Sequence, residues 1–350
     1  MTALLGIALA LLAGAAAFAQ GGPSLPEGSA PIGELHRGPN GEIEVMTPAN
    51  STVPGESPCD KGTLCVGQGQ PYPTLAAALA AARDGDTIEV VAATYRESAT
   101  IAHRNLTIRG VAGRPHFDCA GLALAGNKAC LLIAADGVKL EQLEISGAEL
   151  SDAKGANGAC IRNQPDMSFT LTDVICHGSQ DGILSNGGTI VIDRSEFYDN
   201  GWTGQTHNVY FNGDCTVTVR GSIFRDARVG HEFKSRCPKT TISDSTFRST
   251  HGSRDLDIPD GGDTEVYGST IEKDEGGESE EIIGFTPESC RQPADMILKD
   301  VHIINHRRDA KIHNFDKCDG RAIYLQGVTV EGILPILQGN IVNQGYTLTR

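Results

Sequence analysis

Short segments in which apolar and polar residues alternate recur along most of the chain. Each of the clearest copies begins with an aliphatic residue, carries serine or valine at its fourth position and ends with phenylalanine, isoleucine or valine. These copies lie at residues 192–197, 219–224, 242–247, 266–271, 298–303 and 325–330. Their last residues are 27, 23, 24, 32 and 27 positions apart, and weaker copies lie at 140–145 and 171–176. Such alternation predicts β-strands with one buried face.

A second short apolar segment lies between many of these copies, for example at 208–211 and 255–258, usually with glycine nearby. A period of 23 to 32 residues with two or three short strands predicts a parallel β-solenoid, in which each coil adds one strand to several sheets. A leucine-rich repeat has a similar period, but its Leu-x-x-Leu-x-Leu pattern is absent. A β-sandwich would not explain the recurring phrase.

The open N-terminal end of such a stack needs a cap. Residues 74–83 are rich in alanine and leucine and begin with Thr74, which predicts a short helix with Thr74 as its N-cap. Asp-Gly-Asp at 84–86 then turns the chain into a first strand at 87–91. We expect one continuous β-helix from about residue 87 to 330.

The segments Pro-Thr-Leu-Ala-Ala-Ala-Leu at 73–79, Asp-Gly-Asp-Thr-Ile at 84–88 and Ala-Thr-Tyr-Arg-Glu at 93–97 resemble the opening motif of right-handed parallel β-helix proteins of the pectate-lyase-like superfamily. The resemblance covers roughly residues 60 to 335. It implies an all-β, right-handed parallel β-helix with a short N-terminal capping helix. It does not imply a reaction, because the superfamily includes lyases, hydrolases, esterases, epimerases and binding proteins.

The N-terminus has the pattern of an export signal. Residues 4–18 are uncharged and apolar, and Ala17-Phe18-Ala19 matches an A-x-A cleavage site, so we expect a signal peptide at 1–19. Residues 20–58, rich in Gly, Pro, Ser and Glu, are expected to form a flexible lead-in to a β-helix domain at 59–350. No later run of 18 apolar residues occurs, so we expect no membrane span after signal removal and a secreted or periplasmic protein.

Ten cysteines follow the expected cleavage site, and an even count in an exported chain indicates disulfides. Two pairs are separated by about one coil, and strands of neighbouring coils lie about 4.8 Å apart, within reach of a disulfide. Proximity in the sequence predicts the pairs Cys59–Cys65, Cys119–Cys130, Cys160–Cys176, Cys215–Cys237 and Cys290–Cys318.

Composition narrows the choice of partner. The chain has 29 Lys and Arg against 44 Asp and Glu, a net charge of −15, which argues against nucleic acid and anionic membranes as partners. Residues 220–254 nevertheless hold eight basic and three acidic residues, whereas 255–281 hold eleven acidic residues and one lysine. A basic surface beside an acidic edge suits an anionic polysaccharide, with Ca²⁺ as a candidate cofactor. We expect a monomer.

Polar residues gather on three consecutive second strands, at 207–212, 231–236 and 254–259. With Val209, Phe233 and Leu256 inward, alternation predicts three outward rows flanked by three basic side chains. The rows are Asn208, Glu232 and Asp255; Tyr210, Lys234 and Asp257; and Asn212 and Arg236. The flanking residues are His207, His231 and Arg254. Further candidates for substrate binding are Arg228 and Trp202, the only tryptophan.

The sequence Glu-Phe-Lys-Ser at 232–235, followed by Thr-Phe at 246–247 and Val-Tyr-Gly at 266–268, is similar to the catalytic stretch of chondroitinase B and alginate-lyase-type polysaccharide lyases. This similarity implies that Lys234 is the base of a β-elimination and that Glu232, with other acidic residues such as Asp255 and Asp257, holds Ca²⁺. Where that family has a second catalytic cation, this chain has Pro259. The substitutes are Arg236 or Arg254 as the cation, or His231 or Tyr210 as the acid.

Three other hypotheses remain open from the sequence. Asp255, Asp257 and Glu232 could serve as the carboxylate pair of a glycoside hydrolase. The low aromatic content of 5% favours a non-catalytic carbohydrate-binding or structural solenoid, because sugar sites often contain aromatic side chains. The charged patch could also be a solvated ladder of alternating charges.

Overall fold

The computed structural model describes residues 35–37, 43–45, 57–203 and 205–349, which fall into two units divided after Ser51. In the first unit, β1 (Leu35–Arg37) and β2 (Ile43–Val45) pair in antiparallel fashion. The expected signal peptide and most of the expected lead-in lie outside the described residues.

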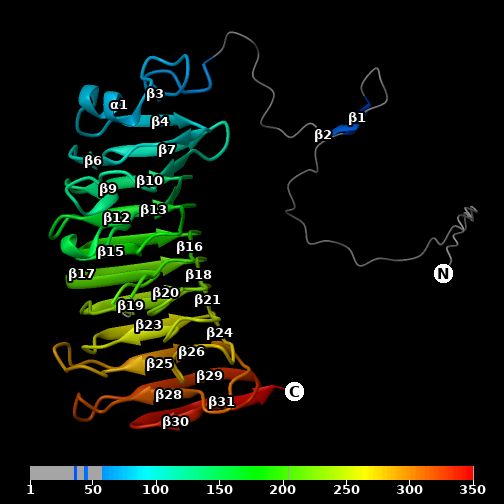
Figure 1. Cartoon of the computed structure of the whole chain (residues 1–350). Helices are drawn as coiled ribbons and strands as arrows, with labels where there is room; N and C mark the ends of the chain where they lie inside the picture. The colour runs from blue at the N-terminus through cyan, green and yellow to red at the C-terminus, as the bar shows by residue number, and fades with distance from the viewer. Residues whose placement is uncertain (1–34, 38–42, 46–56, 204, 350) are drawn as a thin grey trace, which may run out of the picture. The chain divides into compact units, whose positions relative to one another are not determined.

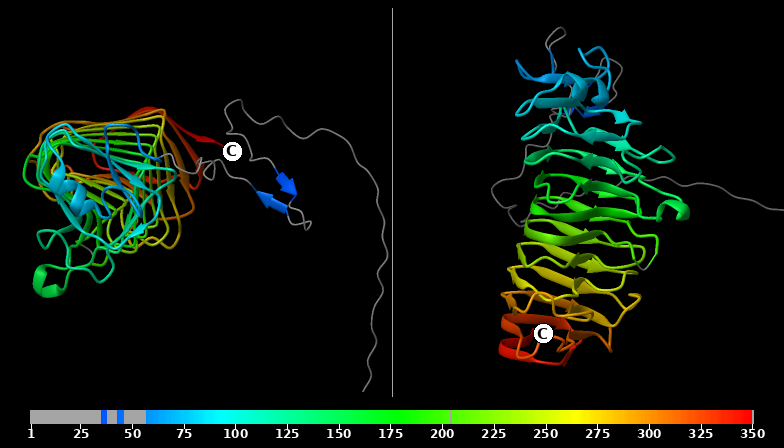
Figure 2. Two further views of the ribbon diagram at one scale, coloured as in Figure 1. Left: turned by 90° about the horizontal axis from the view of Figure 1, so that it is seen from above. Right: turned by 90° about the vertical axis from the view of Figure 1, so that its left-hand side faces the viewer.

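The second unit is a parallel β-helix whose strands stack coil upon coil on three faces (Figures 1 and 2). The first sheet contains β3 (Leu64–Val66), β4 (Thr87–Val91), β7 (Thr107–Val111), β10 (Val138–Glu141), β13 (Phe169–Thr172), β20 (Lys239–Ser243), β23 (Asp263–Tyr267) and β26 (Met296–Lys299). The second contains β5 (Thr94–Tyr95), β8 (His116–Asp118), β11 (Glu144–Ser146), β14 (Ile175–His177), β16 (Glu196–Tyr198), β18 (Ile223–Arg225), β21 (Thr246–Ser249), β24 (Thr270–Lys273) and β27 (His302–Asn305).

The third sheet contains β6 (Ala99–Ile101), β9 (Ala129–Ile133), β12 (Ala159–Asn163), β19 (Phe233–Ser235), β22 (Leu256–Ile258), β25 (Glu281–Phe285), β28 (Lys311–Asn314) and β30 (Ile336–Gln338). Four long strands turn a corner and pair in two sheets each: β15 (Asp181–Asp193), β17 (Val209–Arg220), β29 (Ile323–Gly332) and β31 (Ile341–Thr349). The expected β-helix is confirmed, and it continues past residue 330 to β31.

The repeated phrase spans the corner between the first and second sheets, and its serine explains the recurrence. The backbone N–H groups of Ser195, Ser222 and Ser245 donate to the hydroxyl oxygen of the serine one coil further on, at 3.1, 3.2 and 3.1 Å. Each of these accepting hydroxyls, of Ser222, Ser245 and Ser269, in turn donates to the carbonyl two residues before it. The ladder ends at Ser269. A serine at this position therefore satisfies buried backbone groups that the corner would leave unpaired.

The core is built from ladders of like side chains. Phe197, Phe224 and Phe247 stack with ring centroids 5.3 and 5.1 Å apart, and all three are fully buried. In the first sheet the same coils align four buried aliphatic residues, namely Ile192, Val219, Ile242 and Val266. The first and last residues of the repeated phrase thus form the buried face that its alternation predicted.

The N-terminal cap is also confirmed. Helix α1 (Leu75–Ala81) begins after Thr74, whose hydroxyl accepts a hydrogen bond from the N–H of Ala77 at 3.1 Å. Leu75, Ala78 and Leu79 are buried against the first coils. A 3₁₀ turn, η2 (Asp152–Lys154), is the other helical element within the described residues. None of the helices described there is long and apolar enough to cross a membrane.

All five predicted disulfides are present. Their Cα–Cα distances lie between 4.8 and 6.3 Å, within the usual range, and Cys215–Cys237 has the shortest of them. This bridge and Cys290–Cys318 each join neighbouring coils, and their cysteines are 22 and 28 positions apart in the sequence. Disulfides of this kind form and persist in oxidising compartments.

Candidate functional site

The candidate site lies on the third sheet, where β17, β19 and β22 are neighbours. Val209, Phe233 and Leu256 are in register and fully buried, as predicted. The next position of each strand points away from the core, so the row predicted there is confirmed. It consists of Tyr210, Lys234 and Asp257.

The row expected one residue earlier points into the core, which corrects the prediction. Asn208, Glu232 and Asp255 are completely buried. Strand alternation does not apply to them, because the strands begin only at residues 209, 233 and 256, and the preceding residues belong to the corner. The carboxylate of Glu232 accepts hydrogen bonds from the Asn208 side chain and, at 3.0 Å, from the N–H of Ala227.

Burial changes the ionisation of this inner row. It raises the pKa of Glu232 well above its usual value, and the neighbouring Asp255 adds to the effect. Burial raises the pKa of Asp255 to about 7, although Lys273, whose Nζ lies 3.8 Å from Asp255 Oδ2, opposes the shift. Neither Glu232 nor Asp255 can reach a polysaccharide or an ion on the outer wall. Asn208 is likewise excluded as a substrate contact.

Asp257 lies on the outer side of the sheet but is covered by positively charged and donor groups. Its carboxylate is 3.0 Å from Arg254 Nη1, 3.3 Å from Lys234 Nζ and 3.3 Å from His231 Nε2. The Arg254 guanidinium lies across Gly284 of the next coil, where a Cβ atom would stand 2.7 Å from Arg254 Nε. Of the three expected Ca²⁺ ligands, two are therefore inside the core and the third is held by cations, so this set does not fit the ion. For the same reason, Asp255, Asp257 and Glu232 do not suit the role of the carboxylate pair of a glycoside hydrolase.

Lys234 and Arg236 converge on a carboxylate that no pattern in the sequence indicated. Glu288, in the segment between β25 and β26, has Oε1 3.3 Å from Lys234 Nζ and Oε2 2.6 Å from Arg236 Nη2. Its side chain is 50% exposed, whereas that of Lys234 is 11% exposed. Burial alone would raise the pKa of Glu288, but Arg236 and Lys234 outweigh it and hold that pKa below its usual value.

These groups line a cavity of about 390 Å³, together with Gln205, His207 and Tyr210. Arg236 Nε donates to the Tyr210 hydroxyl at 2.8 Å, and Arg236 Nη1 donates to Asp260 at 2.9 Å. Because its oxygen accepts from Arg236, the Tyr210 hydroxyl keeps its own proton for another acceptor. The cavity thus combines two cations, one half-exposed carboxylate and several neutral donors.

The two histidines of the site stack, with ring centroids 4.8 Å apart. Nδ1 of His207 accepts from the N–H of His231 at 3.0 Å, and Nδ1 of His231 accepts from the N–H of Arg254 at 3.1 Å. Burial and then nearby positive groups lower the pKa of both rings well below the usual value. Both rings are therefore neutral donors through Nε2–H, and His231 does not suit the role of an acid or a base.

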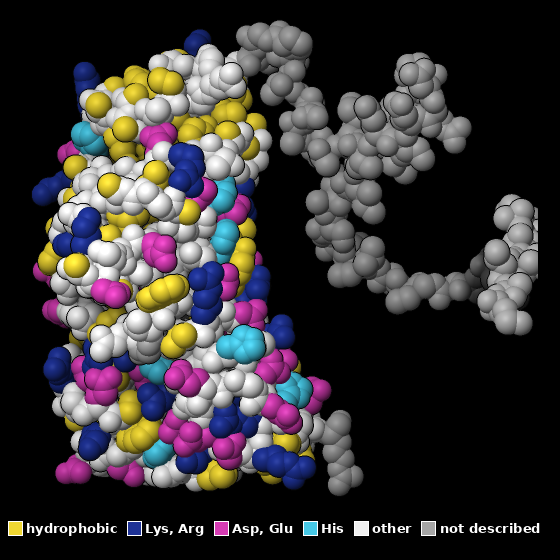
Figure 3. Space-filling view, in the orientation of Figure 1, with side chains coloured by type: hydrophobic (Ala, Val, Ile, Leu, Met, Phe, Trp, Pro, Cys, Tyr) yellow, Lys and Arg dark blue, Asp and Glu magenta, His cyan; other side chains and the backbone are white. Residues whose placement is uncertain are grey.

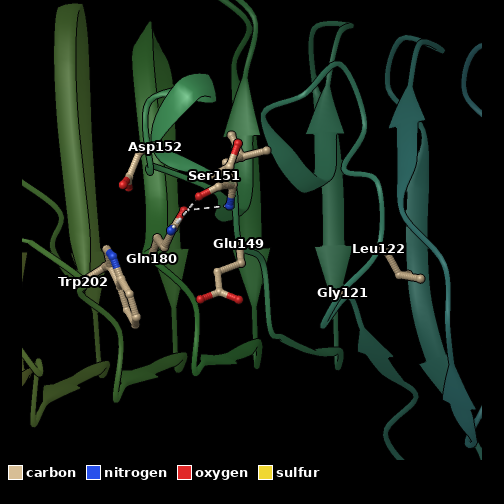
Figure 4. A pocket seen from close by; sticks show the side chains of 8 residues that line it. Gly121, Leu122, Glu149, Ser151, Asp152, Gln180 and Trp202 are labelled. Carbon is tan, nitrogen blue, oxygen red and sulfur yellow. Dashed lines mark hydrogen bonds between the residues drawn. The ribbon is translucent and has the colours of Figure 1, made fainter.

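The other candidates lie elsewhere. Asn212 lines a neighbouring cavity of about 390 Å³ that shares Arg236. Arg228 pairs with Asp199 through two hydrogen bonds of 2.7 and 2.8 Å and does not line the Lys234 cavity. Trp202 is 53% exposed and borders a third cavity, of about 450 Å³ (Figure 4). Glu149, Asp152 and Gln180 also line it.

The basic stretch at 220–254 and the acidic stretch at 255–281 do not form separate surfaces in the structure. The basic and acidic stretches occupy neighbouring coils, so their charges pair across the stack. Lys239 lies 2.9 Å from Asp263, and Arg248 lies 3.8 Å from Glu272. On the face shown in Figure 3, acidic and basic side chains are intermixed over the C-terminal half. The expected basic surface beside an acidic edge is therefore replaced, over these coils, by ion pairs between neighbouring coils.

Comparisons with known proteins agree with this fold. A family model described as a right handed beta helix region matches residues 98–272, half of the chain. No curated protein matches. Among solved structures, pectate lyase Pel9A has a TM-score of 0.54 at 12% identity, covering 81% of this chain and 78% of its own. The pectin methylesterase from Aspergillus niger has a TM-score of 0.45 at 14% identity, covering 82% and 87%.

A third solved structure, the GH136 lacto-N-biosidase from Eubacterium ramulus, has a TM-score of 0.41 at 10% identity, covering 82% of this chain and 67% of its own. At these identities the likeness concerns the fold alone. It is the fold that the opening motif implied, a right-handed parallel β-helix of the pectate-lyase-like type. The chain belongs to the right-handed β-helix family.

Proposed function

We propose that this protein is secreted or periplasmic and binds an anionic polysaccharide in the Lys234–Arg236 cavity, with a uronate carboxylate between the two cations. The observation that carries the proposal is Glu288, whose carboxylate already occupies that position. A site that holds one carboxylate through a lysine and an arginine offers the same charge-assisted hydrogen bonds to another. The five disulfides support export.

Exchange of the two carboxylates is the binding step. Glu288 lies on a connecting segment and is half exposed, so it can leave without disturbing the sheet. The Nε2–H of His207 and the Tyr210 hydroxyl then remain to donate to sugar oxygens. Low aromatic content is compatible with this mode of binding, because charge and hydrogen bonds take the place of stacking.

A second candidate is β-elimination by a polysaccharide lyase, favoured by the contact between Arg236 and Tyr210. Elimination removes the C5 proton, breaks the C4–O bond and delivers a proton to the leaving oxygen. Arg236 would neutralise the carboxylate, Tyr210 would give its proton to the leaving oxygen, and Lys234 would take the C5 proton. The carboxylates 3.3 Å from Lys234 suit a bound ammonium better than a free amine, so binding is the function that the geometry supports best.

The proposal is tested by calorimetric titration with polygalacturonate, alginate and chondroitin sulfate oligosaccharides, and with a neutral dextran oligosaccharide. We expect at least one uronate to bind and dextran not to bind. Arg236→Ala and Lys234→Met should weaken uronate binding at least tenfold, which corresponds to about 1.4 kcal/mol. Lys239→Ala is the matched control, because Lys239 pairs with Asp263 outside the cavity.

Equal binding of dextran, or unchanged uronate binding in both cavity variants, would contradict the proposal. The same oligosaccharides separate the two candidates, because elimination creates an unsaturated product that absorbs ultraviolet light. Growth of that absorbance in the wild type and its loss in Tyr210→Phe would identify a lyase. Binding without new absorbance would identify a carbohydrate-binding protein.

A further inference from the structure

Three metal-ligating side chains meet on the outer face of the second sheet, away from the cavity on the third sheet. They are His116 on β8, Glu144 on β11 and His177 on β14, which are strands of three consecutive coils. In the sequence they are 28 and 33 residues apart, so no short motif reveals them. Parallel stacking in register brings Glu144 directly opposite His116.

Their ligand atoms are spaced as a small metal ion requires. Glu144 Oε1 lies 3.0 Å from His177 Nε2 and 3.9 Å from His116 Nε2, and all three atoms lie within 4.8 Å of one another. Ligands of tetrahedral zinc, bound at about 2.0–2.1 Å, stand about 3.3 Å from one another. Side-chain rotations that move these atoms by less than about 1 Å would bring them to that spacing.

The charge and protonation of the cluster also suit a cation. Among the described residues, Glu144 has no Lys or Arg as an ion-pair partner, so its charge is met only by the two imidazoles. The Nδ1 atom of each ring has no hydrogen-bond partner within the described part of the chain, so the ring proton can move there when Nε2 binds a metal. A second cluster, Glu272, Asp274 and His306, lacks this feature, because Arg248 lies 3.8 and 3.6 Å from its two carboxylates.

Neighbouring residues hold the cluster in place and leave one side open. The His177 ring stacks on Tyr198 with centroids 4.9 Å apart, and the Ser146 hydroxyl lies 2.8 Å from His116 Nε2. The three side chains are between 22 and 31% exposed, so a fourth ligand can come from solvent. Three protein ligands with an open position are the arrangement found at catalytic zinc ions.

From this geometry we infer that His116, Glu144 and His177 form a binding site for Zn²⁺ or a similar first-row divalent ion. Two imidazoles and one carboxylate suit zinc, whereas Ca²⁺ takes six to eight oxygen ligands. The site ties three coils together from outside and keeps a coordination position for water or an anionic group. It does not depend on the proposed polysaccharide function, because none of its residues lines the Lys234 cavity.

The test is titration of EDTA-treated, disulfide-intact full-length protein with ZnCl₂, and with CaCl₂ in parallel, by calorimetry and by thermal unfolding. We expect one Zn²⁺ per chain with a micromolar or lower Kd, a rise of Tm with zinc concentration, and no response to calcium. Glu144→Gln and His177→Gln should each weaken zinc binding at least tenfold while leaving the metal-free Tm unchanged. His306→Gln is the matched control in the second cluster.

Nuclear magnetic resonance of the histidine rings gives a second readout that does not depend on the variants. Zinc should shift the Nε2 signals of His116 and His177 and leave that of His306 in place. Absence of zinc binding, binding that survives both Glu144→Gln and His177→Gln, or loss of binding in His306→Gln would overturn the inference. The three side chains would then form only a hydrogen-bonded surface ladder.

Discussion

Glu288 occupies the position between Lys234 and Arg236 that an incoming carboxylate would need, so it competes with a ligand. Glu288→Gln removes this charge and weakens the two contacts that hold the side chain in place. We expect the variant to bind uronate oligosaccharides about tenfold more tightly, a gain of about 1.4 kcal/mol. Glu275→Gln, at an exposed position, makes the same change in net charge and should leave the affinity unaltered. Equal affinities of Glu288→Gln and wild type would show that Glu288 does not compete.

Glu232 should make stability depend on pH. Its pKa is raised in the folded protein, mainly by burial, so the folded state binds a proton more tightly than the unfolded chain does. Stability is therefore lost as pH rises above about 4.5, the value of an unperturbed Glu, by up to about 1.4 kcal/mol per pH unit until the folded pKa is reached. Glu232→Gln lacks this loss, so its stability relative to wild type should increase from pH 5 to pH 8. Urea unfolding at several pH values measures the free energy of unfolding of both proteins. A difference between them that does not change with pH would contradict a raised pKa of Glu232.

At the scale of the strands, the hydrogen bonds of the serine ladder stabilise the corner that the repeated phrase forms in each coil. Ser222→Ala removes the hydroxyl that accepts from the N–H of Ser195, and leaves that buried N–H without a partner. We expect a loss of about 1–3 kcal/mol in the free energy of unfolding. Ser243→Ala lies two positions before the ladder serine of the next coil and should change it by less than about 0.5 kcal/mol. Equal losses in the two variants would show that the ladder bonds contribute nothing specific.

Strand patterning also explains which parts of the site could be predicted. Alternation placed Tyr210, Lys234 and Asp257 correctly, because all three lie inside strands with a buried neighbour on each side. It failed for Glu232 one residue earlier, because the corner follows its own geometry. Glu288 could not be predicted, since it comes from a segment without repeat and reaches the cavity only through the fold. The His116–Glu144–His177 cluster required the exact register of three coils.

At the scale of the whole molecule, a solenoid is held together by contacts between adjacent coils. The disulfide Cys215–Cys237 joins β17 to the coil of β20, and its removal should act there first. In the double variant Cys215→Ala, Cys237→Ala we expect a loss of about 2–4 kcal/mol. Hydrogen exchange should rise in β17, β19 and β20 and stay unchanged in β7 and β10. Uniform loss of protection along the chain would instead indicate one cooperative unit.

The longest interval between repeats, 32 residues, contains the segment that carries Glu288. The added residues connect β25 to β26 at a corner, and the strands before and after them keep their register with the preceding coil, as the pairings of β22 with β25 and of β23 with β26 show. Changes in the length or sequence of this one segment therefore require no change in the stacked core residues or in the serine hydrogen bonds of the other corners. Insertions or deletions in this connecting segment can therefore change which ligand the cavity binds while the stacked strands stay the same.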